Sequence, residues 1–311
     1  MRGVFGSYPA KAGIQTSKMT QPGKMTMTGF SRPVLFALCA LAVFGPRPAS
    51  AREDCGPETL GTSREISIGG EALPVGFQSY PRTLALEDHE VVLTFDDGPA
   101  ASTGPILDAL AKECVQATFF VIGRNAEAMP ALVKREVERG HSVGHHSYSH
   151  PERTLRLMDD AAARRDIEKG IAAVDKAAGG KAAPFFRFPG YAHTEPLLAW
   201  LKEKGYTVFG SDLWASDWSQ MTPKAQLDLV MGRLEEKKRG IVLFHDSRPQ
   251  TAQMIPDFLR ELKKRGYKVV HMVPGAGPTP VRDAEPGWTS TTEPIIAKTL
   301  GARNRPASPK K

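Results

Sequence analysis

Short apolar runs recur between residues 90 and 273, and Gly, Pro or charged residues bound each of them. Runs of four or five large or β-branched residues are typical of strands buried on both faces. The sequence therefore predicts seven strands, at residues 91–95, 118–122, 142–146, 185–188, 207–211, 241–244 and 268–272.

The segments between these runs are helix-like, and several of them end in a basic residue followed by Gly. Cations suit the C-terminus of a helix, and Gly suits the position just after it. The sequence predicts helices at residues 106–113, 131–139, 159–178, 195–204, 223–238 and 255–265.

Strands that alternate with helices predict an α/β fold of parallel β/α units with right-handed crossovers. Seven such strands fit either an open sheet or a closed barrel. In both arrangements the active site lies at the C-terminal ends of the strands. Residues 52–87 are a Pro- and Gly-punctuated lead-in with one short strand near residues 65–68, and the polar residues 274–311 predict a disordered tail.

The N-terminus, residues 1–51, has the organisation of an export signal. An apolar run at residues 34–44 follows a basic stretch and precedes Ala49-Ser50-Ala51, an A-x-A cleavage site. The run is shorter than the ~20 residues that span a bilayer, so we expect a periplasmic or secreted protein without stable membrane insertion. Translation can start at Met19, Met25 or Met27, and an uncleaved anchor is the alternative.

The formal net charge of +7 is concentrated in the two ends of the chain. Residues 1–51 contain six Lys and Arg and no acid, and residues 274–311 contain six against three acids. The part between them is slightly acidic, so the charge does not indicate a nucleic-acid-binding protein.

Three cysteines are present, and Cys39 lies in the predicted signal. In an oxidising compartment, Cys55 and Cys114 either form a disulfide that ties the lead-in to the domain or remain separate thiols. The sequence does not decide between these two states.

Polar residues gather at the ends of five predicted strands, where an α/β fold places its chemistry. Solvation alone does not explain such a concentration. These residues are Asp96 and Asp97, His145, His146 and His150, Arg187, Asp212 and Asp217, and His245 and Asp246.

One carboxylate and two imidazoles form a common metal site. His141 and His145 would lie on one strand, roughly 13 Å apart at ~3.3 Å per residue. His146 and His150 leave the strand and enter a turn, so both rings can converge with one of the two aspartates. The remaining histidines, His89, His141, His145, His193 and His271, are expected to be packing or surface residues.

Three protein ligands leave a position for water, which a divalent cation activates. The second aspartate can then act as general base, with Arg187 to orient it, and His245 can act as general acid. These parts together predict a metal-assisted hydrolase.

Five ordered segments of the chain resemble the motifs of the NodB-type polysaccharide deacetylases, carbohydrate esterase family 4. They are Thr94-Phe95-Asp96-Asp97-Gly98, His146-Ser147-Tyr148-Ser149-His150-Pro151, Arg187-Phe188-Pro189, Asp217-Trp218 and Leu243-Phe244-His245-Asp246. The resemblance implies a distorted (β/α)7 barrel, a NodB homology domain at residues 88–273, and a divalent metal, most often Zn²⁺, with Co²⁺ or Ni²⁺ as alternatives.

Matching the motifs position by position implies a role for each residue. Asp97, His146 and His150 would bind the metal, while Asp96 would be the base, paired with Arg187. His245 would be the acid, and Leu243 and Trp218 would line the pocket for the acetyl methyl group.

Two departures from the family pattern affect substrate preference more than chemistry. Gly190 stands where the family usually has Tyr, and Tyr191 follows it, although a backbone N–H toward the oxyanion is retained. Asp212 precedes Asp217 by five residues instead of the usual three, so either aspartate can orient His245, and Trp214 between them can form a sugar platform.

We therefore expect an exported hydrolase that removes N-acetyl groups, acting on carbon–nitrogen bonds in linear amides other than peptides. Chitooligosaccharides, peptidoglycan and exopolysaccharides are the candidate substrates. The alternatives are an O-acetyl esterase acting on xylan-like polymers and a non-catalytic glycan-binding module.

Overall fold

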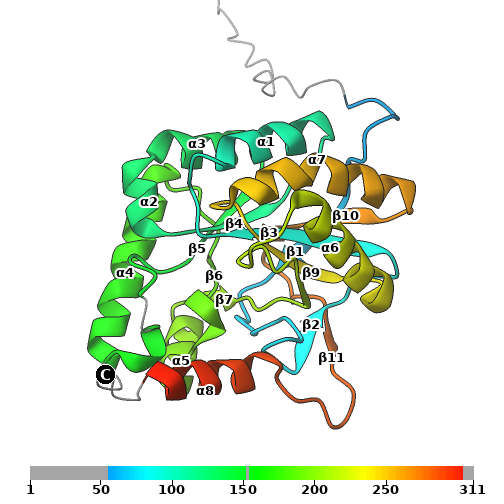
Figure 1. Ribbon diagram of the computed structural model, residues 1–311. Helices are drawn as coiled ribbons and strands as arrows, with labels where there is room; N and C mark the ends of the chain where they lie inside the picture. The colour runs from blue at the N-terminus through cyan, green and yellow to red at the C-terminus, as the bar shows by residue number, and fades with distance from the viewer. Residues whose placement is uncertain (1–54, 152–153, 304–311) are drawn as a thin grey trace, which may run out of the picture. The chain divides into compact units, whose positions relative to one another are not determined.

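The computed structural model describes residues 55–151 and 154–303 (Figure 1). The predicted export signal at residues 1–51 lies outside the described residues. No described helix is both long enough and apolar enough to cross a membrane.

A nine-stranded parallel sheet forms the centre of the fold (Figure 1). Its strands are β1 (Thr62–Ile68), β3 (Glu90–Asp96), β4 (Thr118–Val121), β5 (Ser142–His145), β6 (Phe185–Phe186), β7 (Thr207–Val208), β8 (Leu213–Trp214), β9 (Gly240–His245) and β10 (Lys268–Pro274). β3 has all seven residues buried, as its apolar run predicts.

The strand order nearly closes the sheet into a barrel. From β3 the pairing runs through β4, β5 and β6 to β7 in one direction, and through β9 to β8 in the other. The two ends of this path meet in residues 209–212, the segment that joins β7 to β8. β10 pairs with the start of β3 and carries β1 on its other edge. The α/β fold with parallel strands and alternating helices is confirmed.

Helices cover the outside of the sheet, and α1, α3 and α7 lie along the same side of it (Figure 1). The helices are α1 (Thr103–Lys112), α2 (Gly123–Ala128), α3 (Pro130–Glu138), α4 (Asp160–Ala177), α5 (Glu195–Glu203), α6 (Pro223–Lys237), α7 (Pro249–Lys264) and α8 (Thr292–Arg303), with short 3-10 turns at Leu155–Leu157 and Pro189–Tyr191. Side chains of Asp159, Thr194 and Thr222 accept the first free N–H groups of α4, α5 and α6.

The side chains of β3 alternate between two cores. Val91, Leu93 and Phe95 pack outward against the helices, whereas Val92 belongs to a cluster inside the ring of strands. Because successive side chains of a strand point to opposite faces, Thr94 and Asp96 share the inner face with Val92. The first carboxylate of the motif is therefore directed into the mouth of the barrel.

All seven predicted strands and all six predicted helices are present, with ends that differ by a few residues. The sequence reading missed α2, β8 and the three-residue strand β2 (Arg82–Leu84), because segments this short carry too few positions to show a period. The predicted lead-in, residues 52–87, supplies β1 to the main sheet, which therefore begins before residue 88.

The prediction of a disordered tail is wrong for residues 274–303. Within them, β11 (Val281–Asp283) pairs antiparallel with β2, and α8 buries Ile296. The composition of the tail is polar because it contributes only a few apolar side chains to a surface that the rest of the chain has already formed. A count of polar residues therefore does not reveal its order.

The structure contains the Cys55–Cys114 disulfide, with a Cα–Cα distance of 5.8 Å. It ties the lead-in to the residues that follow α1, 59 positions further along the chain. Of the two states that the sequence allows, the structure thus selects the bridge, which is typical of proteins that fold in an oxidising compartment.

Candidate active site and metal cluster

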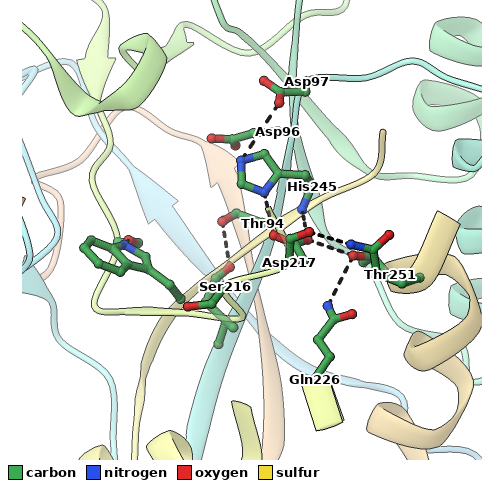
Figure 2. A network of polar contacts seen from close by, with 12 residues as sticks. Thr94, Asp96, Asp97, Ser216, Asp217, Gln226, His245 and Thr251 are labelled. Carbon is green, nitrogen blue, oxygen red and sulfur yellow. Dashed lines mark hydrogen bonds and ion pairs between the residues drawn. The ribbon is translucent and has the colours of Figure 1, made fainter. Parts of the chain in front are cut away.

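The chemistry-bearing side chains converge at the carboxyl ends of β3, β5, β6 and β9, as the fold class predicts. Asp96 ends β3, and His245 ends β9, directly opposite it in the register of the two strands. Figure 2 shows Asp96 and Asp97 on one side of the His245 ring and Asp217 on the other.

Asp97, His146 and His150 form the cluster that can hold a metal ion, with one potential ligand atom from each residue within 4.8 Å of the others. Asp97 Oδ1 lies 3.5 Å from His146 Nε2 and 3.4 Å from His150 Nε2. This oxygen is buried and has no hydrogen-bond partner among the described residues. An orphaned carboxylate oxygen that faces two imidazole nitrogens fits a divalent cation, because it lacks any other compensation for its burial.

The protonation of the cluster also suits a cation. Burial raises the pKa of Asp97, but the facing His146 ring and the nearby His245 and His150 rings outweigh it and hold that pKa well below its usual range. Burial, assisted by the neighbouring His146, lowers the pKa of His150. A charged carboxylate and a neutral imidazole, as at Asp97 and His150, are the forms in which these side chains bind a metal.

Local backbone geometry directs these side chains inward. Asp97 has φ 74° and His150 has φ 45°, both in the left-handed region that non-glycine residues rarely adopt. His146 donates from Nδ1 to the Arg187 carbonyl oxygen at 2.7 Å, which leaves Nε2 to face Asp97. The His150 N–H donates to Ser147 Oγ at 3.1 Å. The Arg187 carbonyl oxygen thus fixes the His146 ring, and Ser147 holds the backbone from which the His150 ring projects.

Gly98 makes room for the carboxylate that follows His245. A Cβ added at Gly98 would lie 1.9 Å from Asp246 Oδ2, so this position requires glycine. Burial raises the pKa of Asp246 to about 7, with Asp97 and Asp96 adding to the effect. Thr103 donates to the same carboxylate from the first turn of α1. Asp246 therefore packs beneath the Asp96-Asp97 turn.

Asp96 and Arg187 form a fully buried ion pair behind the cluster. Arg187 Nη1 donates to Asp96 Oδ1 at 2.7 Å, and its side chain has no exposed surface. The same guanidinium donates to Thr94 Oγ1 at 2.9 Å and to the Gly210 carbonyl oxygen at 2.7 Å. Asp96 Oδ2 remains directed toward His146, with Nε2 3.8 Å away. Arg187 thus fixes one carboxylate oxygen and leaves the other toward the metal cluster.

His245 is held from behind by Asp217. Its Nδ1 lies 2.7 Å from Asp217 Oδ1, and its backbone N–H donates to Oδ2 at 2.6 Å. Thr251 also donates to Oδ2 at 2.7 Å, and Gln226 donates to Thr251 at 3.2 Å, so the fully buried carboxylate ends a chain of donors (Figure 2). His245 Nε2 points back toward the cluster, 4.0 Å from Asp97 Oδ2.

This environment changes the acidity of His245. Burial alone would lower its pKa, but the hydrogen bond and charge of Asp217, with smaller effects from Asp97 and Asp96, raise it to about 9. The imidazole is therefore protonated at neutral pH, which is the form required of a general acid.

Asp212 does not belong to this site, and its assignment as a catalytic candidate is wrong. Its carboxylate accepts 2.8 Å hydrogen bonds from Phe77 N, Thr83 Oγ1 and Ile241 N. Ile241 lies near the start of β9, whereas His245 is its last residue. Asp212 thus links the lead-in to the opposite end of β9, and of the two candidates Asp212 and Asp217 it is Asp217 that contacts His245.

An apolar wall borders the cluster. Leu243 is buried in a small hydrophobic core with Tyr191 and Ile296, and Trp214 packs against this core. Tyr191 and Trp214 are stacked, with ring centroids 6.4 Å apart, and both bond to Ser211 Oγ. The wall is therefore fixed by polar contacts at its outer edge, and α8 of the tail contributes to it.

Trp218 stands at the open side of the site. Its ring packs edge-on to His245 with centroids 5.9 Å apart and to Trp214 with centroids 5.6 Å apart. It is 45% exposed, an unusual state for a large aromatic residue. Gly190, with φ 59°, lies in the turn that leads to Tyr191.

The sequence analysis missed the supporting residues Gln226 and Thr251, and it gave no role to Thr94 and Asp246. Thr94 and Asp246 adjoin motif residues, which offered a weak signal, whereas Gln226 and Thr251 lie on α6 and α7 with no local mark of function. The spare histidines have the expected packing roles. For example, His141 Nδ1 accepts the Ala117 N–H at 3.1 Å, and His271 Nε2 accepts the Ser142 N–H at 3.2 Å.

Comparisons with known proteins agree with this site. A sequence model described as "Polysaccharide deacetylase" matches residues 84–209. A peptidoglycan-N-acetylglucosamine deacetylase of Bacillus cereus is 28% identical over 252 residues, which cover 76% of this chain and 88% of that protein.

Two solved structures are similar. The Bdellovibrio bacteriovorus peptidoglycan deacetylase Bd3279 has a TM-score of 0.62 and 31% identity, over 75% of this chain and 62% of its own. A family 4 carbohydrate esterase from Streptomyces lividans, solved in complex with acetate, has a TM-score of 0.51 and 32% identity, over 60% of this chain and 91% of its own. The chain therefore belongs to the polysaccharide deacetylase family, carbohydrate esterase family 4.

Proposed function

We propose that this protein is a metal-dependent deacetylase that hydrolyses N-acetyl groups of amino sugars in a polysaccharide, with the N-acetylglucosamine of peptidoglycan as the first candidate. The observation that carries the proposal is the position of a carboxylate and an imidazole, each held by a buried side chain of opposite charge, beside one metal cluster. Asp96 is held by a buried cation and His245 by a buried anion, and both face Asp97, His146 and His150.

Asp97, His146 and His150 are the proposed metal ligands, and Zn²⁺ is the proposed ion because nitrogen and oxygen donors of this kind suit it. When bound, a divalent cation lowers the pKa of a water molecule and polarises an acyl oxygen.

Asp96 is the proposed general base. Its free Oδ2 faces the cluster, and the pairing of Oδ1 with Arg187 keeps the carboxylate in one orientation. In that position it takes the proton of the attacking water as the new bond to the acetyl carbon forms. Since Arg187 also bonds to Thr94 and Gly210, the base does not have to reorganise during the reaction.

The acetyl group is proposed to sit against Leu243 and Trp218, with the Gly190 N–H directed at the developing oxyanion. The buried Leu243 supplies an apolar surface for the methyl group, and the exposed face of Trp218 suits a sugar ring. Trp214 and Tyr191 extend this wall.

His245 is the proposed general acid. Its raised pKa keeps Nε2 protonated near neutral pH, and Asp217 holds the ring through Nδ1. The Nε2 proton is then transferred to the sugar nitrogen as the carbon–nitrogen bond breaks, and the amine leaves in its neutral form. An amine is a poor leaving group unless it is protonated. Amide hydrolysis therefore requires the general acid more than ester hydrolysis does, and the presence of His245 favours an amide substrate.

The Cys55–Cys114 disulfide supports a location outside the reducing cytosol, and we propose that the protein is exported. We propose a polysaccharide deacetylase domain at residues 88–273. β1 of the lead-in and the ordered part of the tail pack onto this domain.

Acetate release tests the function. The purified protein is stripped with a chelator, reloaded with Zn²⁺, and assayed on N-acetylglucosamine oligomers, peptidoglycan and acetylated xylan. We expect zinc-dependent release from the amino-sugar substrates. His150→Ala should abolish the release, whereas His89→Ala, an exposed histidine outside the cluster, should leave it unchanged. Release from xylan alone would replace the proposal with an O-acetyl esterase, and no release would leave a glycan-binding module.

A further inference from the structure

A second pocket lies at the other end of the strands from the metal cluster. It has a volume of about 630 Å³, within the range of ligand-binding cavities. We call it the distal pocket, and its lining includes Phe77, Asp212, Lys237, Arg239, Arg282 and Trp288. Gly240, where β9 begins, also lines it, and at ~3.3 Å per residue it is separated from His245 by roughly 16 Å.

The distal pocket is built mostly by parts of the chain that the family model does not match. The family model ends at residue 209, whereas Arg282 lies on β11 and Trp288 lies between β11 and α8. Figure 1 shows β11 and α8 at the end of the chain. Trp288 Nε1 donates to the Phe77 carbonyl oxygen at 2.9 Å, which fixes the indole ring at the edge of the pocket. A fixed, half-buried indole is a surface on which the apolar face of a sugar ring can stack.

Two cations of the pocket have no carboxylate of a described residue within ion-pair distance, although the charge of Arg282 acts on the buried Asp212 carboxylate. Arg239 and Arg282 make no ion pair within 4.0 Å with any residue of the described ranges, although Arg239 donates to the Leu86 carbonyl oxygen. Arg282 lies over the Phe77 ring, 5.3 Å from its centroid. Guanidinium groups that make no close ion pair provide planar donors, which a carboxylate takes in pairs.

The other charged groups of the pocket are already engaged or lie at its rim. Asp212 accepts three hydrogen bonds, Asp283 lies 3.6 Å from Arg82, and Lys237 lies 3.1 Å from Glu236. Glu285 is the exposed acid that remains at the rim. Among the charged groups of the lining that make no ion pair within 4.0 Å and accept no hydrogen bond in the described part of the chain, two are cations, Arg239 and Arg282, and one, Glu285, is an acid.

We propose that the distal pocket binds a carboxylate-bearing glycan, with a sugar ring on Trp288 and the carboxylate between Arg239 and Arg282. The inference rests on the proposed function in that it takes the polymer as the ligand. Bound there, an acidic polymer would tether the enzyme without occupying the catalytic site, and the effective concentration of acetylated units near the metal would rise.

Calorimetric titration tests the proposal with the disaccharide of N-acetylglucosamine and N-acetylmuramic acid, which carries one carboxylate. N,N′-diacetylchitobiose is the neutral comparison and the dipeptide Ala-Glu the acidic, sugar-free one. Each titration is run on zinc-loaded and on chelator-treated protein. We expect binding of the acidic disaccharide to survive chelation and to be at least ~10-fold tighter than that of either comparison.

The variants Arg282→Gln and Trp288→Ala should each weaken this binding by roughly 10-fold or more, whereas Arg260→Gln, an exposed arginine on α7, should not. Arg282→Gln should leave acetate release from neutral N-acetylglucosamine oligomers unchanged, so failure of the pocket and failure of the proposed function are separate results. Unchanged affinity in both variants, loss of binding on chelation, or equal binding of Ala-Glu would each overturn the proposal.

Discussion

Asp217→Asn isolates the effect of the carboxylate on His245. The asparagine has nearly the same shape, and its amide oxygen can still accept from Nδ1, but the negative charge is gone. In the native protein Asp217 is the first cause that raises the His245 pKa, to about 9 from the ordinary 6.5, against the opposing effect of burial. Because only the smaller effects of Asp97 and Asp96 then oppose burial, we expect the pKa of His245 in the variant to fall to about 6.5 or below.

The size of the effect follows from this shift. A difference of about 2.5 pKa units corresponds to roughly 3 kcal/mol of interaction with the imidazolium. At pH 8, about nine-tenths of His245 is protonated in the native enzyme and only about 3% in the variant, so activity should fall roughly 30-fold at this pH. The loss should shrink as the pH falls toward 6, where the acid is protonated again in a larger share of the variant.

The assay is kcat/KM for acetate release from N-acetylglucosamine oligomers between pH 5.5 and 10, with Zn²⁺ held constant. The native alkaline limb should lie near pH 9 and that of Asp217→Asn near pH 6.5 or below. Asp175→Asn is the matched control, because Asp175 contacts a different histidine, His145, at 3.2 Å. Two profiles that fall at the same pH and differ by a constant factor would refute the reasoning and leave Asp217 a purely geometric role.

Three further outcomes follow from the buried contacts. Arg187→Met leaves the Asp96 carboxylate buried without its partner and should lower the free energy of unfolding by about 3–5 kcal/mol in chemical denaturation, so a loss below ~1 kcal/mol would contradict the buried pair. Replacing both Cys55 and Cys114 by Ser opens a link across 59 residues and should cost about 4 kcal/mol, seen as a drop in Tm of roughly 10 °C, and an unchanged Tm would show that the bridge constrains little. Adding a chelator to the zinc-loaded protein should lower its Tm, whereas His146→Ala should have the lower Tm from the start and show no response, and an equal response in both would place the ion elsewhere.

The strands and the location of the site were predictable because both depend on local patterns. In a chain of alternating strands and helices, a short apolar run that is buried on both faces is a strand of a parallel sheet. Parallel strands bring their carboxyl ends to one edge of that sheet. His146 and His150 could be singled out in the same way. The rise per residue of a strand places His141 and His145 too far apart to bind one metal ion.

The partner of His245 could not be found by such reasoning. Asp212 and Asp217 stand in the same loop, and only the path of that loop decides which one reaches the imidazole. Asp212 is used instead to accept the Phe77 and Ile241 N–H groups at the other end of β9. The donors Thr251 and Gln226 are equally hidden, because they come from helices distant in sequence and have no local signature.

The sequence by itself determined the alternation of strands and helices, the set of metal-ligating and acid–base residue types, and their convergence at one edge of the sheet. These follow from side-chain period and backbone direction, which act over a few residues. Only the tertiary structure decided the pairing of Cys55 with Cys114, the choice of Asp217, the order of the tail and the presence of the distal pocket. Each of these depends on contacts between segments far apart in the chain, and the geometry of such contacts is fixed only when the whole core packs.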